Sequence, residues 1–256
     1  MSDSEIQRLL RRLAALPEPG MREAVLAEQL RSRPTEEAVS LAGEIVRRAP
    51  NGRPYDVALL ALSGLLDAGR ISYDERRELH AIARQRDDIL LVRLLLSPKD
   101  APLGVPQPVA LPGRPDITLG ERKSLARTRD RQLIDRLLHD PDPSVLTILL
   151  GNPYLTEADA IRVAARRPTT PEAQRILFRS QRFRVRYAVR KALILNPYTP
   201  TDMAAQLVGL LTVPDVKQVE RDAQLSDAVR AAARAQLAVL ALQRAEARSS
   251  AGKSDD

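Results

Sequence analysis

The sequence predicts an all-α fold in which an N-terminal helical bundle is followed by a short α-solenoid. Two observations indicate the helical class: apolar residues recur at helical spacing along most of the chain, and no sustained alternation of Val, Ile, Thr and aromatic residues predicts a strand. A third observation indicates the solenoid, because the turn Asn-Pro-Tyr occurs twice, 44 residues apart. The 256 residues are enough to bury the core of one or two domains.

Residues 1–100 hold six segments that predict the bundle. Their boundaries carry turn and cap residues, among them Gly69 and the capping box Ser72-Tyr-Asp-Glu75, and we expect Thr35 to cap the third helix. The fourth segment is almost continuously apolar, which predicts that its helix lies at the centre of the bundle. The predicted helices cover 4–16, 21–31, 35–49, 55–68, 72–85 and 87–96.

Five prolines between positions 102 and 115 interrupt the helical pattern. Because proline removes a backbone donor and cannot adopt the geometry of a helix interior, these residues predict an extended connector over 101–116. We expect the solenoid to cover 117–244. Residues 245–256 have no apolar face and predict a disordered tail.

Helix-capping residues follow one another at short intervals after the connector, so the helices there have room for about two to four turns each. A further helix is expected over 185–195, where Val185, Ala188, Val189, Ala192 and Leu193 form one apolar stripe. The predicted N-caps are Thr118, Asp142, Thr156, Thr170 and Thr199.

An internal repeat supports the solenoid. Residues 151–160 align with residues 195–204, and each copy follows the apolar end of a predicted helix. A weaker third copy begins at Ser226. Repeats of this length built from short helices are typical of solenoids.

The residues at the first copy resemble a known family. Asp140-Pro-Asp-Pro-Ser-Val145, an apolar helix and Gly151-Asn-Pro-Tyr154 are similar to HEAT-type and variant leucine-rich α-solenoid repeats, over about residues 130–240. The chain departs from the family where Leu146 replaces the usual Arg, and it lacks the cysteines that variant-repeat proteins with an iron–sulfur domain require. The resemblance implies a curved stack of helices with a binding surface, and it implies no reaction.

The positive charge is concentrated in one segment. Residues 162–191 carry ten basic side chains and one acidic side chain, whereas the whole chain has a net charge of +7. Codon usage in a GC-rich bacterial genome would explain why most basic residues are Arg, but it does not explain their clustering. A concentrated charge indicates a local anionic partner.

The spacing of the arginines predicts a stripe. Three successive predicted helices each carry an Arg pair four residues apart, and equivalent faces of successive helices line up in a solenoid. The predicted partner-binding residues are Arg162, Arg166, Arg175, Arg179, Arg182, Arg184, Arg186, Tyr187, Arg190 and Lys191.

Four interpretations of this segment remain open. An acidic protein surface is the favoured partner. Nucleic acid is the alternative, because HEAT-like proteins can grip the DNA backbone and arginines interleaved with aromatic rings suit stacking on bases. The arginines can instead bond to neighbouring carboxylates and helix C-terminal carbonyls, or they can pair with acidic patches of another copy of the chain.

The sequence offers no catalytic centre. It has no cysteine and two histidines, and no phosphate-binding loop, nucleophile motif or metal-ligand spacing is recognisable. No apolar stretch approaches the ~20 residues that span a bilayer, and the N-terminus has no secretory pattern. We therefore predict a non-enzymatic scaffold or interaction protein of the bacterial cytoplasm, with no cofactor, no metal and no membrane insertion.

Overall fold

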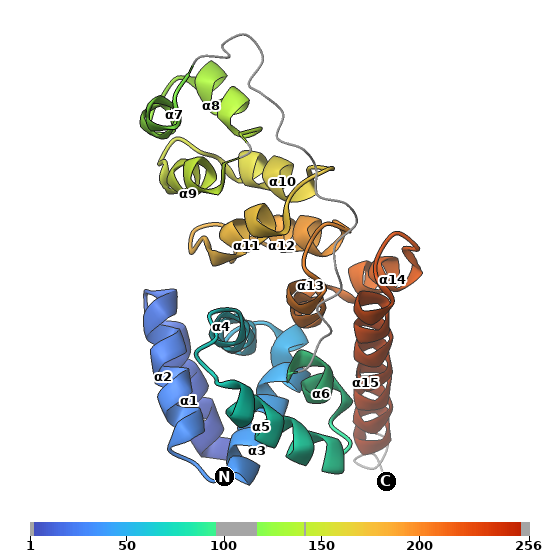
Figure 1. Cartoon of the computed structure of the whole chain (residues 1–256). Coiled ribbons are helices and arrows are strands. Elements are labelled where there is room, and N and C mark those ends of the chain that lie inside the picture. The colour runs from blue at the N-terminus through green and yellow to red at the C-terminus, as the bar shows by residue number, and fades with distance from the viewer. Residues whose placement is uncertain (1–2, 96–116, 141, 252–256) are drawn as a thin grey trace. The chain divides into compact units, whose positions relative to one another are not determined.

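The computed structural model describes residues 3–95, 117–140 and 142–251, and every regular element in these ranges is a helix (Figure 1). The chain divides into two compact units. One unit combines residues 1–98 with residues 201–256 and is called the terminal unit below. The other, the central unit, consists of residues 99–200. The all-α class predicted from the sequence is confirmed for the described residues.

The terminal unit is organised around helix α4 (Tyr55–Asp67), which packs against α1, α2, α3 and α13. The α4 residues from Val57 to Leu66 are all buried, so the predicted central helix of the bundle is confirmed. The other helices of this unit are α1 (Asp3–Ala15), α2 (Pro19–Arg31), α3 (Thr35–Arg48), η1 (Ala49–Asn51), α5 (Tyr73–Gln85), α6 (Ile89–Leu95), α13 (Thr201–Leu207), η2 (Val208–Leu210), α14 (Val213–Arg221) and α15 (Asp227–Ala251).

Local signals placed most of these boundaries correctly. The capping box is present at α5, where the Ser72 hydroxyl accepts from the Glu75 amide at 3.2 Å and the Glu75 carboxylate accepts from the Ser72 amide at 2.6 Å. Gly69 follows α4 with a φ of +65°, a conformation that glycine adopts without strain. The cap predicted at Thr35 is wrong, because Pro34 is the N-cap and Thr35 already belongs to α3.

The end of the predicted solenoid differs from the structure. Helices α13 and α15 pack on α6, and α13 also packs on α4, so residues from Thr201 onward belong to the terminal unit and the central unit ends at Pro200. The weak third copy of the repeat at Ser226 lacks the Asn-Pro-Tyr turn that marks the first two copies. Helix α15 extends to Ala251, where a disordered tail was expected from residue 245. The predicted connector over 101–116 and residues 252–256 lie outside the described ranges.

The central unit contains six described helices, and alternate helices contact one another. Helix α9 packs on both α7 and α11, and α10 packs on α12. Helix α8 was missed from the sequence, although Asp130 caps it by accepting from the Gln132 amide at 2.8 Å. The helices are α7 (Leu119–Leu125), α8 (Arg131–Leu137), α9 (Pro143–Gly151), α10 (Glu157–Ala165), α11 (Pro171–Arg179) and α12 (Tyr187–Ile194).

Four of the five N-caps predicted in this part of the chain are confirmed. The side chains of Thr118, Asp142, Thr156 and Thr170 each accept from a backbone amide in the first turn of the helix that follows. Thr199 behaves differently, because its hydroxyl donates to the Leu193 carbonyl at 2.6 Å and the next helix begins at Thr201.

The repeated Asn-Pro-Tyr turn makes the same hydrogen bonds in both copies. In the first copy the buried Asn152 amide donates to the carbonyls of Ala126 at 2.9 Å and Thr128 at 2.7 Å. In the second copy the buried Asn196 amide donates to the carbonyls of Ala164 at 2.7 Å and Arg166 at 2.8 Å. The sequence repeat therefore corresponds to a repeated structural device, which ties each turn to the end of an earlier helix.

Removing either asparagine side chain should destabilise the central unit. Asn152→Ala leaves two carbonyls without their donor, and such a loss costs about 3 kcal/mol. Asn196→Ala should cost a similar amount. Urea unfolding followed by circular dichroism measures the effect, and Asn51→Ala at an exposed position of η1 is the control. Equal stability of the three variants would contradict this role for the turn.

The close packing of α3 on α6 gives a second prediction. A Cβ atom on Gly43 would lie 2.3 Å from Oδ2 of Asp88, whose Oδ1 accepts from the Leu91 amide at the start of α6. Gly43→Ala should therefore displace Asp88 and lose about 1 kcal/mol of cap stabilisation, which offsets the gain of about 1 kcal/mol that alanine brings to a helix, so it should be less stable than a Gly→Ala change without this contact. Gly20→Ala is the matched control in α2, because a Cβ there meets no atom within 4 Å. Equal changes of stability in the two variants would argue against this contact.

Candidate binding surface of the central unit

The central unit holds the positive excess of the chain. It has 18 basic and 10 acidic residues, a net charge of +8, whereas the terminal unit has 22 basic and 23 acidic residues, a net charge of −1. The charge imbalance seen along the sequence therefore coincides with one compact body. This concentration makes the surface of the central unit the candidate binding surface.

The structure divides the predicted binding residues by their exposure. Arg184 and Arg190 are buried, with 5% and 7% of their surface exposed. Arg166, Arg175, Tyr187 and Lys191 are half-buried. The exposed members of the set are Arg162, Arg179, Arg182 and Arg186.

The predicted stripe of three Arg pairs is not formed. In each pair one arginine is exposed and the other is half-buried or buried. Helix α10 packs on α12 while α11 packs on α9, so successive helices lie in different rows and do not present one continuous face. Arg166 also lies beyond the end of α10 as its C-cap, where burial lowers the pKa of its guanidinium and Asp140 opposes this shift.

Burial of Arg190 corrects the predicted apolar stripe. Helix α12 begins at Tyr187, and Val185, which was expected to face inward, is 42% exposed. Arg190 faces inward instead, where its guanidinium donates to the carbonyls of Arg184 at 3.3 Å and Val185 at 2.7 Å and lies 5.9 Å from the Tyr187 ring centre. Its charged end thus binds the turn before α12, and neither Arg184 nor Arg190 is accessible to a partner.

Arg162 belongs to an ion-pair network that joins α8 to α10. Its guanidinium lies 2.9 Å from Asp135 and 3.3 Å from Asp159, and Arg131 makes two hydrogen bonds to the buried Asp159 carboxylate. Asp159 also completes the capping box of Thr156. The hydrogen bonds from Arg131 hold the pKa of Asp159 far below its usual range. Two carboxylates therefore already neutralise much of the charge of Arg162.

Arg182 is held by carbonyl groups. Its guanidinium donates to the carbonyls of Asn152 at 2.9 Å, Pro153 at 3.2 Å and Leu155 at 2.7 Å, and it lies 4.9 Å from the Phe183 ring centre. These bonds use three of the five N–H groups of a guanidinium and none of them involves a carboxylate. Arg182 is thus fixed in position against the first Asn-Pro-Tyr turn while it keeps its full positive charge.

Arg179 and Arg186 make loose ion pairs at the surface. Arg179 lies 3.9 Å from Glu172, and Arg186 lies 3.7 Å from Glu157. The two arginine side chains are 52% and 57% exposed. Exposed pairs of this kind contribute about 0–1 kcal/mol, so at Arg186 a partner's carboxylate can replace that of Glu157 at little cost.

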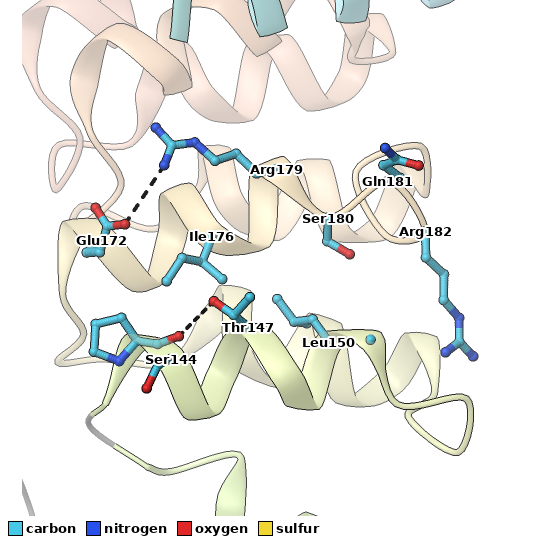
Figure 2. A pocket seen from close by; sticks show the side chains of 11 residues that line it. Ser144, Thr147, Leu150, Glu172, Ile176, Arg179, Ser180, Gln181 and Arg182 are labelled. Carbon is cyan, nitrogen blue, oxygen red and sulfur yellow. Dashed lines mark hydrogen bonds and ion pairs between the residues drawn. The ribbon is translucent and has the colours of Figure 1, made fainter. Parts of the chain in front are cut away.

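A groove of about 680 Å³ lies between α9 and α11 and includes two of the exposed arginines. Figure 2 shows Glu172 and Arg182 toward opposite ends of the groove, with Thr147, Leu150 and Ile176 between them. Sequence reasoning counted charges and so missed the α9 side of this groove, whose residues are uncharged. The lining residues are Pro143, Ser144, Thr147, Leu150, Gly151, Glu172, Ile176, Arg179, Ser180, Gln181 and Arg182.

No helix in the described part of the chain is long and apolar enough to cross a membrane. Within the same residues, no group of three or more His, Asp or Glu side chains is arranged to hold a metal ion. The candidate surface is thus defined by its arginines and by the groove.

No protein-family model matches the chain, and searches of curated proteins and of solved structures found no match.

The ion-pair network predicts how stability depends on pH. Because the pKa of Asp159 is lower in the folded protein than in the unfolded chain, its stabilisation is present above the ordinary value of about 4 and is lost as the pH falls below it. Asp159→Asn should cost about 3 kcal/mol at neutral pH, because the charged hydrogen bonds are lost and the helix cap is weakened. Below about pH 4 the stability of this variant should fall less steeply than that of the unmodified protein. Urea unfolding at several pH values, with hydrogen exchange at α10, measures both effects.

Glu172→Gln is the control, since the Glu172 carboxylate is half-exposed and makes the loose pair with Arg179. An acid transition of the same steepness in Asp159→Asn and in the unmodified protein would show that another carboxylate governs it.

Proposed function

We propose that the protein is a non-enzymatic interaction or scaffold protein of the bacterial cytoplasm, whose central unit binds an acidic surface on a partner protein. The observation that carries this proposal is the positive excess of the central unit, with Arg179, Arg182 and Arg186 exposed on it. We also propose that the central unit is a short HEAT-like α-solenoid. The contacts between alternate helices and the repeated asparagine turn support this assignment.

The state of the exposed arginines suits the recognition of carboxylates. A planar guanidinium matches the geometry of a carboxylate and forms two parallel hydrogen bonds with it. The internal pair of Arg186 is loose and Arg182 is held by carbonyls, so at these two arginines a partner gains charge-assisted bonds without first breaking a buried ion pair. Positive charge concentrated in one body also accelerates encounter with an acidic partner.

The aromatic residues favour a protein partner over nucleic acid. Binding to bases requires exposed rings, but Phe178 and Phe183 are buried in the core, and Arg190 lies beside the ring of Tyr187. In the central unit Tyr154 is 55% exposed, and it takes the place of the predicted Tyr187 as the ring best placed for a contact.

Charge reversal of the two loosely paired arginines tests the proposal. The double variant Arg179→Glu and Arg186→Glu should lose the proteins that the unmodified chain captures from native lysate, because like charges then face the acidic partner. Capture should persist after nuclease treatment and weaken as salt is raised. The far-UV circular dichroism spectrum should be unchanged, since both pairs are exposed.

Arg77→Glu with Arg84→Glu is the matched control, because both arginines are exposed on α5 of the terminal unit and the change in net charge is the same. Equal loss of capture in the control and the test variant would reject a local surface. Capture abolished by nuclease, with a slope of log K against log salt of about −0.9 for each neutralised phosphate, would favour the DNA-backbone alternative instead.

A further inference from the structure

We propose that the groove between α9 and α11 binds an extended peptide segment of the partner, in which an aliphatic residue is flanked by acidic residues. This inference rests on the proposed function and specifies the chemistry of the ligand. It is carried by three features of the groove: its apolar floor, its fixed positive charge, and the hydrogen-bonding state of its hydroxyl groups.

The floor of the groove is apolar and has the length of a short peptide. Leu150 of α9 and Ile176 of α11 lie in its middle (Figure 2). Glu172 and Arg179 are two helical turns apart, or about 10.5 Å at 1.5 Å per residue. An extended peptide rises about 3.3 Å per residue, so about three residues span this length, and one aliphatic side chain can cover the floor.

The charges of the groove are unequal at its two ends. Arg182 is fixed by three backbone carbonyls and keeps two N–H groups for a ligand. At the other end Arg179 extends back along α11 toward Glu172 (Figure 2). A peptide carboxylate therefore bonds to Arg182 in a preformed site, and a second carboxylate competes with Glu172 for Arg179.

The hydroxyl groups of α9 distinguish a peptide backbone from a phosphate backbone. The Thr147 hydroxyl already donates its hydrogen to the Pro143 carbonyl at 2.9 Å, and the Ser144 hydroxyl donates to the Asp142 carboxylate. Each hydroxyl therefore offers only lone pairs to a ligand in the groove. A peptide supplies N–H donors for these oxygens, whereas a phosphate brings acceptors that they repel.

Gly151 provides a way to fill the groove without disturbing the core. It lines the groove at the end of α9, and a Cβ atom there would meet no other atom within 4 Å. Gly151→Phe should therefore place a ring in the path of the peptide while the fold is kept. Gly151→Asp is a second, smaller variant, which adds a negative charge to the groove.

The experiment measures binding of a fluorescent acidic peptide, Asp-Glu-Leu-Asp-Glu, by anisotropy. The comparison peptide, Lys-Gln-Leu-Gln-Lys, has the same length and a positive charge, and a short single-stranded oligonucleotide tests phosphate binding. The unmodified protein should bind the acidic peptide at least about tenfold more tightly than either comparison ligand. Gly151→Phe and Gly151→Asp should each weaken its binding by at least about tenfold.

Gly20→Phe is the matched control, because a Cβ at Gly20 of α2 also meets no atom within 4 Å, and it should bind like the unmodified protein. Unchanged peptide binding in both Gly151 variants, or no binding by the unmodified protein at ~1 mM peptide, would overturn the inference. If lysate capture still requires Arg179 and Arg186 while the Gly151 variants capture normally, the proposed function stands and the groove is not its site.

Discussion

A buried asparagine amide that bridges two carbonyl groups is the interaction on which the central unit depends. The last carbonyls of a helix have no partner within the helix. Asn152 and Asn196 solve this problem identically, each donating to two carbonyls of a segment more than twenty residues earlier. Because the same turn recurs, one hydrogen-bonding device fixes the chain at two places in the central unit, which also holds the groove between α9 and α11.

The arginines of the basic segment serve different purposes although they have the same chemistry. Arg190 satisfies backbone carbonyls from inside the fold, and Arg182 does so from its surface. Arg162 is tied to two carboxylates, whereas Arg186 keeps a loose and exposed pair. A guanidinium has five donors and no acceptor, so a fold with many free carbonyls and few acids can use it as a structural crosslink. The net charge of a segment therefore overestimates the charge available to a partner.

Local signals in the sequence predicted most of the helices, but they did not predict the long-range packing. The caps at Ser72, Thr118 and Thr156 were predictable because a cap depends on residues only three positions apart. The burial of Arg190 depends on carbonyls freed by the turn before α12, which no helical wheel contains. The packing of α13 on α4 joins segments far apart in the chain, so no local pattern predicts it. The residues on the α9 side of the groove are uncharged, so a count of charges did not reveal them.

The division of the terminal unit between the two ends of the chain has a consequence for biosynthesis. Helix α4 is translated long before α13, yet the two pack together in the same unit. A ribosome must therefore complete residues 99–200 before that packing is possible, so the central unit emerges while the apolar surface of the first six helices still awaits its cover. Synthesis therefore fixes the order of assembly within the terminal unit, with α13 to α15 docking last.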